Sequence, residues 1–443
     1  MFKKYKILKI SSIIFLLLLS HLSFYLIIDQ NRSSIRNFLL ENKLIDIKKI
    51  FFLKKVFKGK YNYRNLSQNK LKDNFPENFN LTFIESNHQI IDLLPIISSD
   101  DDTHGLITSV EKLNNNFHIL TSGGFILILD KDYKLKKKIN LKSIFKNFHT
   151  DLGLGGIRGA VWKNKDKVFI YTTAYIGDKY KIIILSIDIT NKKVVDSYTF
   201  EDLLQQDGYA VNLGGGIELI NDNIILTIGD GSEVDSFDKS LISQNDISFY
   251  GKIISIKINK LDNDFYFDKV KLLAKGIRNS QGLKLIDNNI IFVEHGPRGG
   301  DKVAILENSN DIINYGWPIF SYGQTYETAD TFFERTELKK THNSYDKKFK
   351  KPIFYFNPSI ATSDLAQCPF TNSNYNQFRN CIVVSSLKDT SFYILKYDKP
   401  NEEINIKSFE RIFVGERIRK LFVENKIIYL FLDSFKIIKI IYK

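Results

Sequence analysis

The sequence predicts an all-β domain, a six-bladed β-propeller, preceded by an N-terminal transmembrane helix and a short helical or linker stalk. Three observations predict this fold class. An uncharged segment near the N-terminus is long enough to cross a bilayer. Beyond it, short strands with alternating apolar residues replace helical periodicity. One pair of strands recurs there at intervals typical of propeller blades. The expected domains are residues 1–30 (cytoplasmic tail and signal anchor), 31–79 (basic stalk) and 80–443 (propeller).

The expected anchor is Ile10–Ile28, which contains 19 residues without a charge and follows four lysines. A helix needs roughly 20 such residues to span a bilayer. No small-residue cleavage site follows, so an uncleaved signal anchor is expected. The basic residues on the two sides of this segment nearly balance, but a short basic tail before a large domain favours a propeller outside the cytoplasm, in a periplasmic or other extracytoplasmic location. The segment 33–60 fits a basic amphipathic helix on lipid and a solvated stalk equally well.

The positive charge is concentrated at the N-terminus. Residues 1–60 hold 13 Lys or Arg residues and three acids, a net of +10 out of the total of +13. The remaining chain is therefore close to neutral. This distribution indicates a membrane-proximal segment and argues against nucleic-acid binding.

The blades are predicted from a strand, a tight Asn- or Asp-containing turn and a second strand. This pattern recurs every 50 to 66 residues, with one double-length interval before the last copy. The interval contains its own strands at 381–386 and 391–396, which brings the number of blades to six. A pair of β-sandwiches is the alternative. The five visible copies begin at Ile107, Ile157, Gly216, Gly282 and Ile418.

The two cysteines, Cys368 and Cys381, bracket a polar loop between apolar runs. In an exported domain a disulfide would close this loop. Two unrelated buried thiols are the alternative. A metal site is poorly supported, because no histidine lies near either cysteine.

The segment Gly276–Pro318 carries the most informative motifs. Arg278, Asn279 and Gln281 crowd the start of a predicted strand, where β-branched residues fit better. Long polar side chains at such a place predict a lined pocket. The motifs are R-N-S-Q-G-L from Arg278, E-H-G-P-R-G-G-D from Glu294 and N-Y-G-W-P from Asn314.

With these motifs, the region from about Gly105 to Asp433 resembles the glucose/sorbosone dehydrogenase family, the soluble quinoprotein aldose dehydrogenases. Weaker motifs occur in the family's order. They are G-L-G-G-I-R-G from Gly153, G-K-I from Gly251, P-S-I-A from Pro358, S-L-K from Ser386 and R-I-R from Arg417. The resemblance implies a six-bladed propeller that oxidises sugars with pyrroloquinoline quinone (PQQ), with calcium beneath the cofactor.

The resemblance also implies roles for individual residues. Lys388, Arg417 and Arg419 match the positions that bind the carboxylates of PQQ, where an arginine fork is well suited. Arg278 and Asn279 match the residues that polarise the quinone oxygen, and Gln281 adjoins them as a further cofactor contact. The calcium ligands would be the backbone carbonyls of Gly296 and Pro297, with Tyr315 as a further calcium-associated residue.

The sequence departs from the family pattern at four positions. Asn212 occupies the place of the histidine base, and an amide cannot accept a proton near neutral pH. Gly216 replaces an arginine, Leu154 replaces a cofactor-contacting glutamine, and Lys302 replaces a carboxylate of the G-G-D-E loop.

Two hypotheses follow from these departures. In the first, which the family motifs favour, the protein is a sugar dehydrogenase with a rearranged base; His149, Asp151, Asp230 and His295 are the candidates. In the second, the propeller has lost catalysis and acts as a ligand-binding or interaction module. In both, a sugar or another anionic ligand occupies the channel.

Overall fold

The computed structural model describes most of the chain beyond residue 80. The chain divides into two units, residues 1–65 and 66–443, and the first lies wholly outside the described residues. The expected anchor Ile10–Ile28 and the stalk lie outside them too, as do Asp151 and Leu154. No helix in the described part of the chain is long and apolar enough to cross a membrane. The described ranges are 81–82, 87–93, 105–149, 156–203, 212–231, 241–297, 299–323, 348–369, 380–400 and 403–441.

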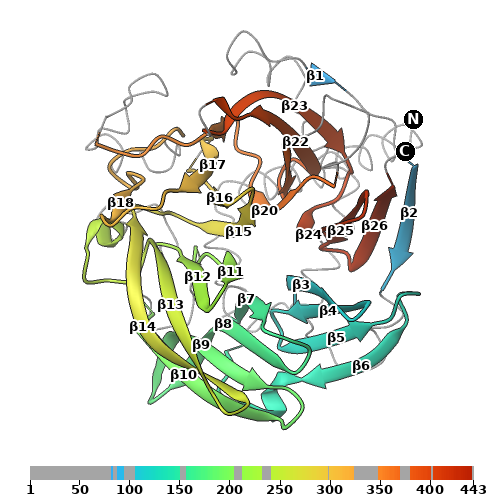
Figure 1. Ribbon diagram of the computed structural model, residues 1–443, viewed down its shortest axis with the longest axis vertical. Coiled ribbons are helices and arrows are strands. Elements are labelled where there is room, and N and C mark those ends of the chain that lie inside the picture. Colours follow the sequence, from blue (N-terminus) through green and yellow to red (C-terminus); the bar gives the residue numbers. More distant parts are fainter. Residues whose placement is uncertain are drawn as a thin grey trace, which may run out of the picture. The chain divides into compact units, whose positions relative to one another are not determined.

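The described residues of the second unit form a six-bladed β-propeller with almost no helix (Figure 1). Each blade is an antiparallel sheet whose strands follow chain order from the inside outward. The first three blades are β3 (Ile107–Leu113), β4 (Asn116–Thr121), β5 (Phe125–Leu129) and β6 (Leu135–Asn140); β7 (Ile157–Trp162), β8 (Lys167–Ile176), β9 (Lys179–Asp188) and β10 (Lys193–Asp202); and β11 (Ile217–Ile220), β12 (Asn223–Ile228), β13 (Lys252–Leu261) and β14 (Asp264–Lys275).

The other three blades have the same order, and the last of them is completed from the N-terminal side. They are β15 (Ser280–Ile286), β16 (Asn289–Glu294), β17 (Asp301–Leu306) and β19 (Phe354–Phe356); β20 (Thr362–Gln367), β21 (Cys381–Ser386), β22 (Ser391–Asp398) and β23 (Asn405–Phe413); and β24 (Ile418–Glu424), β25 (Ile427–Leu432) and β26 (Lys436–Ile441) with β2 (Asn87–Asp92).

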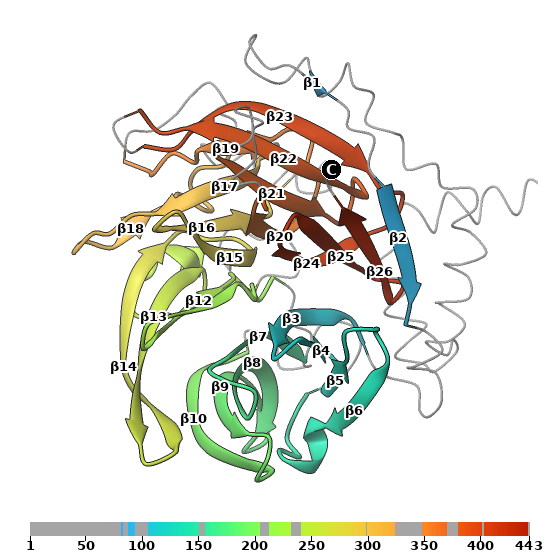
Figure 2. The same cartoon turned by 45° about the vertical axis from the view of Figure 1, so that its right-hand side comes forward.

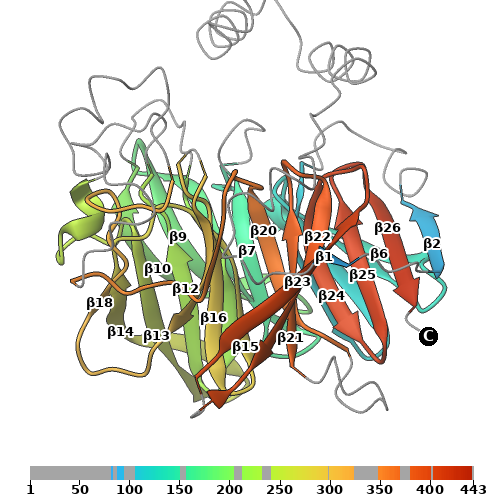
Figure 3. The ribbon, with the colours of Figure 1, turned by 90° about the horizontal axis from the view of Figure 1, so that it is seen from above.

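The ring is closed in two ways. Strand β2 pairs antiparallel with β26, so residues from before the first blade form the outer strand of the last one (Figure 2). The innermost strands β3, β7, β11, β15, β20 and β24 each contact the next, and β24 contacts β3. Seen from a perpendicular direction, neighbouring blades stand side by side (Figure 3).

Two short strands and two 3₁₀ turns lie outside the regular blade pattern. Strand β1 (Leu81–Thr82) pairs parallel with β23, and β18 (Ile313–Asn314) pairs parallel with β14. The 3₁₀ turns are η1 (Leu141–Ser143) and η2 (Leu241–Gln244).

The apolar core lies between the blades. Six buried clusters each combine residues of two neighbouring blades, one cluster for each of the six blade interfaces. Strand β4 shows the reason: Phe117 and Ile119 face the last blade, whereas Leu120 faces the second. Both faces of a blade are thus buried, at roughly 1.5–3 kcal/mol for each large apolar side chain.

The predicted six-bladed architecture is confirmed. Each of the five visible repeats corresponds to the first two strands of a blade. In the remaining blade the predicted strands are β21 and β22, the second and third of the sheet. Its innermost strand, β20, was not predicted, because T-S-D-L-A-Q lacks a regular apolar alternation.

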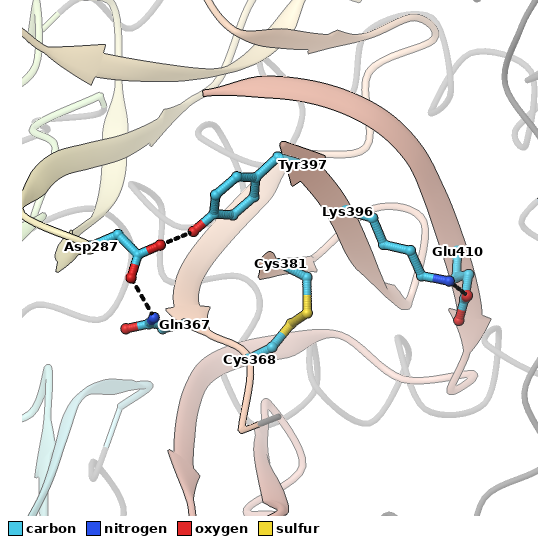
Figure 4. Close-up of a disulfide and its surroundings, with 7 residues drawn as sticks. All are labelled: Asp287, Gln367, Cys368, Cys381, Lys396, Tyr397 and Glu410. Atoms are coloured by element: carbon cyan, nitrogen blue, oxygen red, sulfur yellow. Dashed lines mark hydrogen bonds and ion pairs between the residues drawn. A yellow bond between two sulfur atoms is a disulfide. The ribbon is translucent and has the colours of Figure 1, made fainter. Parts of the chain in front are cut away.

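The structure joins Cys368 and Cys381 by a disulfide between the end of β20 and the start of β21 (Figure 4). Both are buried in the interface between the last two blades. Nearby, Asp287 accepts hydrogen bonds from Gln367 Nε2 (2.9 Å) and from the Tyr397 hydroxyl (2.5 Å). Asp287 lies in the turn after β15, so these bonds connect the fourth and fifth blades.

Candidate functional site

A cavity of about 80 Å³ lies where the six innermost strands begin, at one end of the central channel. All six blades contribute to its wall, because the innermost strands run in the same direction and start around one ring. The lining residues are Leu106, Ile107, Thr108, Ser122, Ile157, Arg158, Gly214, Gln281, Ser363, Arg419 and Lys420.

The cations in and beside this cavity come mainly from β24. Arg419 donates to Asp433 through Nε (2.8 Å) and Nη2 (3.0 Å), and Arg417 donates to the same carboxylate through Nε (2.8 Å). Burial alone would raise the pKa of Asp433, but the two guanidiniums outweigh it and hold that pKa below its ordinary value. Asp433 therefore stays ionised and fixes both arginines.

A third and a fourth cation complete this group. Arg158, near the start of β7, lines the cavity, and so does Lys420. Lys420 Nζ donates to Gln281 O (3.2 Å) and lies 3.8 Å from Asp364 Oδ1. Burial lowers the pKa of the Arg158 guanidinium, and the positive charge of Arg419 acts in the same direction. Among the described side chains, four cations thus stand with two carboxylates, Asp433 and Asp364, so the described part of the cavity wall is positive.

Further along the channel the charges balance. Lys284 of β15 donates to Glu218 of β11 at 2.7 Å. The carboxylates of Glu218, Glu111 and Asp364 raise the pKa of Lys284 against the opposing effect of burial. Burial raises the pKa of Glu111. Among the described residues, the excess of positive charge therefore lies at the cavity end of the channel.

Arg278 lies at this end, in the loop before β15. Its backbone N–H donates to Glu294 Oε1 (2.8 Å), and its Nη1 donates to Gly296 O (3.2 Å). The guanidinium carbon lies 5.4 Å from the centre of the Trp317 ring, within cation–π range. Trp317 Nε1 in turn donates to Asp230 Oδ2 at 2.7 Å. The predicted Arg278 is therefore held from three sides.

Asn279 connects the third and fourth blades. Its Oδ1 accepts from Gly214 N (3.1 Å), and its Nδ2 lies 3.4 Å from His295 Nδ1. His295 Nε2 lies 2.5 Å from the carbonyl oxygen of Thr362, so Nε2 carries the proton and Nδ1 accepts. Burial lowers the pKa of His295, and together with the charges of Arg278 and Arg419 it outweighs the opposing effects of Asp301 and of the Thr362 carbonyl. The imidazole is therefore neutral.

Asp301 organises the turn that contains Gly296 and Pro297. The carboxylate is fully buried. Oδ1 accepts from Gly296 N (2.8 Å) and Ser359 Oγ (2.7 Å), and Oδ2 accepts from Ile360 N (2.9 Å) and Ala361 N (2.5 Å). One side chain thus ties the turn after β16 to the loop before β20.

These contacts do not fit a calcium ion at the predicted ligands. The Gly296 carbonyl accepts from the Arg278 guanidinium, a cation that competes with calcium for the same oxygen. The Tyr315 hydroxyl donates to Ile305 O (2.5 Å), and burial raises the pKa of this phenol. Lys302 lies 3.2 Å from Glu294 Oε2 in a buried ion pair. The described residues contain no cluster of three acidic, His or Cys side chains.

The departures on the third blade lie in the loop before β11. Asn212 has a left-handed backbone (φ 54°), and its carbonyl accepts from Gly231 N (3.2 Å). Gly216 has no room for a side chain: a Cβ there would lie 2.9 Å from Thr227 Oγ1 and 3.0 Å from Leu283 Cβ. With this backbone, position 216 therefore cannot accommodate the arginine that the family pattern has there.

The candidate replacement bases differ in their surroundings. His149 Nδ1 lies 3.2 Å from Thr173 Oγ1 and its ring packs on Tyr180; it is not among the residues that line the cavity. Both nitrogens of His295 are engaged, as described above. Asp230 is fully buried next to the site, and its backbone N–H donates to Arg278 O (2.8 Å).

The structure thus brings most of the predicted site residues to one end of the channel. Gln281 and Arg419 line the cavity, and Arg417 joins them through Asp433. Lys388 has an exposed side chain that does not line it. Sequence reasoning assigned no role to Arg158, Lys420, Asp433 or Asp301. Arg158 lies within the quoted motif from Gly153, and Lys420 directly follows the motif from Arg417. Both stand at the starts of inner strands, and this position was the available indication.

Comparison with known proteins identifies the family. The family model for Glucose / Sorbosone dehydrogenase matches residues 109–438. An uncharacterized protein of Synechocystis sp. is 27% identical over 213 residues, 45% of this chain and 48% of that protein. The aldose sugar dehydrogenase YliI of Escherichia coli is 31% identical over 166 residues, 36% of this chain and 40% of that protein. The chain thus spans less than half the length of these curated relatives.

Solved structures show the same fold. The soluble aldose sugar dehydrogenase from Escherichia coli, in its apo form, has a TM-score of 0.59 at 18% identity, covering 80% of this chain and 99% of that chain. The PQQ domain of pyranose dehydrogenase from Coprinopsis cinerea, in its holo form, has a TM-score of 0.53 at 11% identity, covering 82% and 98%. At these identities the similarity establishes the fold alone.

Proposed function

Since the chain belongs to the Glucose / Sorbosone dehydrogenase family, we propose that it is a membrane-anchored oxidoreductase that oxidises a sugar with PQQ. The observation that carries the proposal is the positive cavity at the start of the six innermost strands, with Arg278 and Asn279 fixed beside it. A propeller that served only as a scaffold would have no need for four cations around one cavity.

PQQ fits the donor set of this site. It carries three carboxylates, and the cavity end of the channel offers Arg158, Arg417, Arg419 and Lys420. When bound, the quinone would accept a hydride from the anomeric carbon of the sugar. Arg278 and Asn279 would orient the quinone and donate hydrogen bonds to its oxygen, because Glu294, Gly296 and Gly214 already fix their positions.

The proton of the sugar hydroxyl needs a base, and this requirement limits the proposed turnover. An amide at Asn212 cannot take a proton, and His295 uses both nitrogens. Among the described candidates, Asp230 is the carboxylate that adjoins Arg278. Full burial keeps it from a substrate unless the surrounding loops move, so we propose slow oxidation.

A binding protein without catalysis is the second candidate function. Two observations favour it: the amide of Asn212 cannot accept a proton, and both ring nitrogens of His295 are already engaged. In that case the cations would hold an anionic ligand in the channel, and no sugar would be oxidised.

We also propose that the propeller lies outside the cytoplasm, anchored in the bilayer by Ile10–Ile28. The short tail of four lysines that precedes this apolar stretch supports the proposal. The disulfide between Cys368 and Cys381 also supports it, because disulfides persist in oxidising compartments.

Cofactor binding is the first test. The full-length protein is titrated with PQQ, with and without calcium, and its absorbance and melting temperature are followed. We expect binding that does not require calcium, because the Gly296 carbonyl accepts from Arg278 and the Tyr315 hydroxyl donates to Ile305 O. If saturating PQQ changes neither quantity, the quinoprotein function is refuted.

Restoring the base is the second test. A dye-coupled assay with aldoses compares the native protein, Asn212→His, and Asn212→His with Leu154→Gln. We expect the variants to gain turnover, up to the 10²–10⁴-fold or so that a general base supplies. If none of the three proteins oxidises an aldose with PQQ bound, the result would favour a binding protein without catalysis.

A further inference from the structure

We propose that a second cavity, between the first and second blades, binds a small phenolic carboxylate. Such a ligand is a flat ring with a hydroxyl group at one end and a carboxylate at the other. The hydroxyl group donates to Nε2 of His118, and the carboxylate lies near Lys137 at the rim of the cavity. This site goes beyond the proposed function and does not depend on it.

The second cavity has a volume of about 190 Å³ and lies at the other end of the propeller from the positive cavity. Ile107, the first residue of β3, lines the positive cavity, whereas Leu113, the last residue of β3, lines the second one. A strand rises about 3.3 Å per residue, so the two cavities are roughly 20 Å apart. The wall comes from β3 to β6 of the first blade and from the turns after β7 and β9 of the second, which is its neighbour in the ring (Figure 1).

His118 offers an unused acceptor in the buried wall of this cavity, where the residue is 4% exposed. Its Nδ1 lies 3.2 Å from Asn116 O, which can only accept, so Nδ1 carries the proton. Burial lowers the pKa of His118 and outweighs the opposing effect of this bond, so the ring is neutral and Nε2 keeps its lone pair. Among the described residues no donor binds Nε2. A buried acceptor without a donor is costly, and a bound hydroxyl group would remove that cost.

The strand register places an apolar residue and a cation in line with His118. In the first blade His118 pairs with Ile128, and Ile128 pairs with Lys137. Directly paired residues point to the same face of a sheet, so these three side chains form one row. Neighbouring strands are about 4.8 Å apart, which puts the Cα atoms of His118 and Lys137 roughly 10 Å apart. A benzene ring that lies over Ile128, with its two polar groups in para positions, can reach from one to the other.

The rest of the wall favours a flat apolar body. Ile139 of the first blade and Ile189 of the second are buried and line the cavity. A cavity of about 150 Å³ lined by apolar side chains is known to bind benzene, so about 190 Å³ accommodates a benzene ring with a hydroxyl group. A sugar would turn several hydroxyl groups toward these aliphatic side chains, and each unpaired hydroxyl group would be costly.

The rim of the cavity is positive among the described residues. Lys137 and Lys165 are exposed, and neither forms an ion pair with a described residue. Asp166 is the acid that lines the cavity. Its Oδ1 accepts from Thr190 Oγ1 (2.6 Å), and its backbone carbonyl accepts from Ile189 N (2.8 Å). Two cations beside one carboxylate favour an anionic group at this end of the ligand.

The test measures affinity in the full-length protein by calorimetry and by ligand-observed NMR. The probes are 4-hydroxybenzoate, benzoate, which lacks the hydroxyl group, and phenol, which lacks the carboxylate. The variants are His118→Phe, which fills the space without an acceptor, and Lys137→Gln, which removes a rim charge. Lys138→Gln is the matched control, because Lys138 is the next residue of β6 and pairs with Leu127, on the opposite face of the blade.

We expect the native protein to bind 4-hydroxybenzoate about 10-fold more tightly than benzoate, because the hydroxyl group gains a hydrogen bond to Nε2. His118→Phe should abolish this preference. Lys137→Gln should weaken binding of 4-hydroxybenzoate about 2–5-fold, as for an exposed ion pair, and leave phenol unchanged. Lys138→Gln should change neither affinity.

Three results would overturn the proposal. The first is no binding of 4-hydroxybenzoate at millimolar concentration, and the second is equal affinity of the native protein for 4-hydroxybenzoate and benzoate. The third is binding that neither His118→Phe nor Lys137→Gln changes, which would place the ligand elsewhere, for example in the positive cavity. If His118→Phe fails to fold, Lys137→Gln decides, and unchanged affinity for 4-hydroxybenzoate would refute the site. None of these results bears on PQQ binding, which is tested separately.

Discussion

Replacing Asp301 by asparagine tests the link between the site and the scaffold. The carboxylate accepts four hydrogen bonds, three of them from backbone N–H groups. An amide offers one oxygen in place of two. In the best orientation of the amide, its oxygen keeps the hydrogen bonds from Ile360 N and Ala361 N. Its NH₂ group then donates to the Ser359 hydroxyl. Gly296 N–H is then left without an acceptor.

The expected cost follows from these bonds. An orphaned buried donor costs about 1–3 kcal/mol, and each remaining bond loses roughly 1 kcal/mol when its acceptor loses the charge. The neutral amide is cheaper to desolvate, which offsets part of the loss. We expect Asp301→Asn to lower the free energy of unfolding by about 2–4 kcal/mol, and Ser359→Ala by about 1 kcal/mol.

Urea denaturation of the full-length protein measures both changes, with an unchanged m-value as the condition for comparing them. The double variant should lose less than the sum of the two, because Ser359→Ala removes a charge-assisted bond from the native protein but only a neutral one from Asp301→Asn. The affinity for PQQ should fall in Asp301→Asn, since the turn that places Gly296 against Arg278 is loosened. A cost below about 1 kcal/mol, or full additivity, would refute this account of Asp301.

Three further predictions concern single groups. Folding lowers the pKa of His295, so the unfolded chain binds a proton first as the pH falls below the ordinary value of 6.5, and this contribution to stability is lost at acidic pH. Nitrogen NMR should show a neutral ring protonated at Nε2 at pH 6.5; an imidazolium there would contradict the structure. Replacing both Cys368 and Cys381 by alanine should cost roughly 2–4 kcal/mol, and two free thiols in the purified native protein would exclude the bond. Protease added to intact spheroplasts should digest the propeller, whereas a protected propeller would refute export.

The fold was predictable because each blade buries both faces. Alternating apolar residues therefore recur in every hairpin, as in the strands that begin at Ile107 and Ile157. Strand β20 escaped prediction because Ser363 and Asp364 make contacts to β24, which belongs to the next blade and lies far away in the sequence. The same holds for β2, whose partner β26 lies at the other end of the chain.

The site was predictable where its residues are neighbours in sequence, as are Arg278, Asn279 and Gln281. It was not predictable where it depends on pairing between distant elements. Asp433 reaches Arg417 and Arg419 because β24 and β25 form a hairpin whose register places Ile418 opposite Leu432. Arg158 meets Arg419 because the first and last blades are adjacent in the ring and bring β7 and β24 to one cavity.

The backbone at Asn212 makes the exchange for histidine a clean test of chemistry. A left-handed conformation is several-fold enriched in Asn, Asp and His relative to other side chains, so φ of 54° suits both residues. Contacts of the backbone hold the loop: Gly214 N donates to Asn279, and Gly231 N donates to the carbonyl of residue 212. The variant should therefore fold with a melting temperature close to the native value. Gly216 needs no accompanying change, because its surroundings leave no space for an arginine. If Asn212→His binds PQQ with native affinity yet gains no turnover, the missing base is not what limits oxidation, and the fault lies in the position of the cofactor.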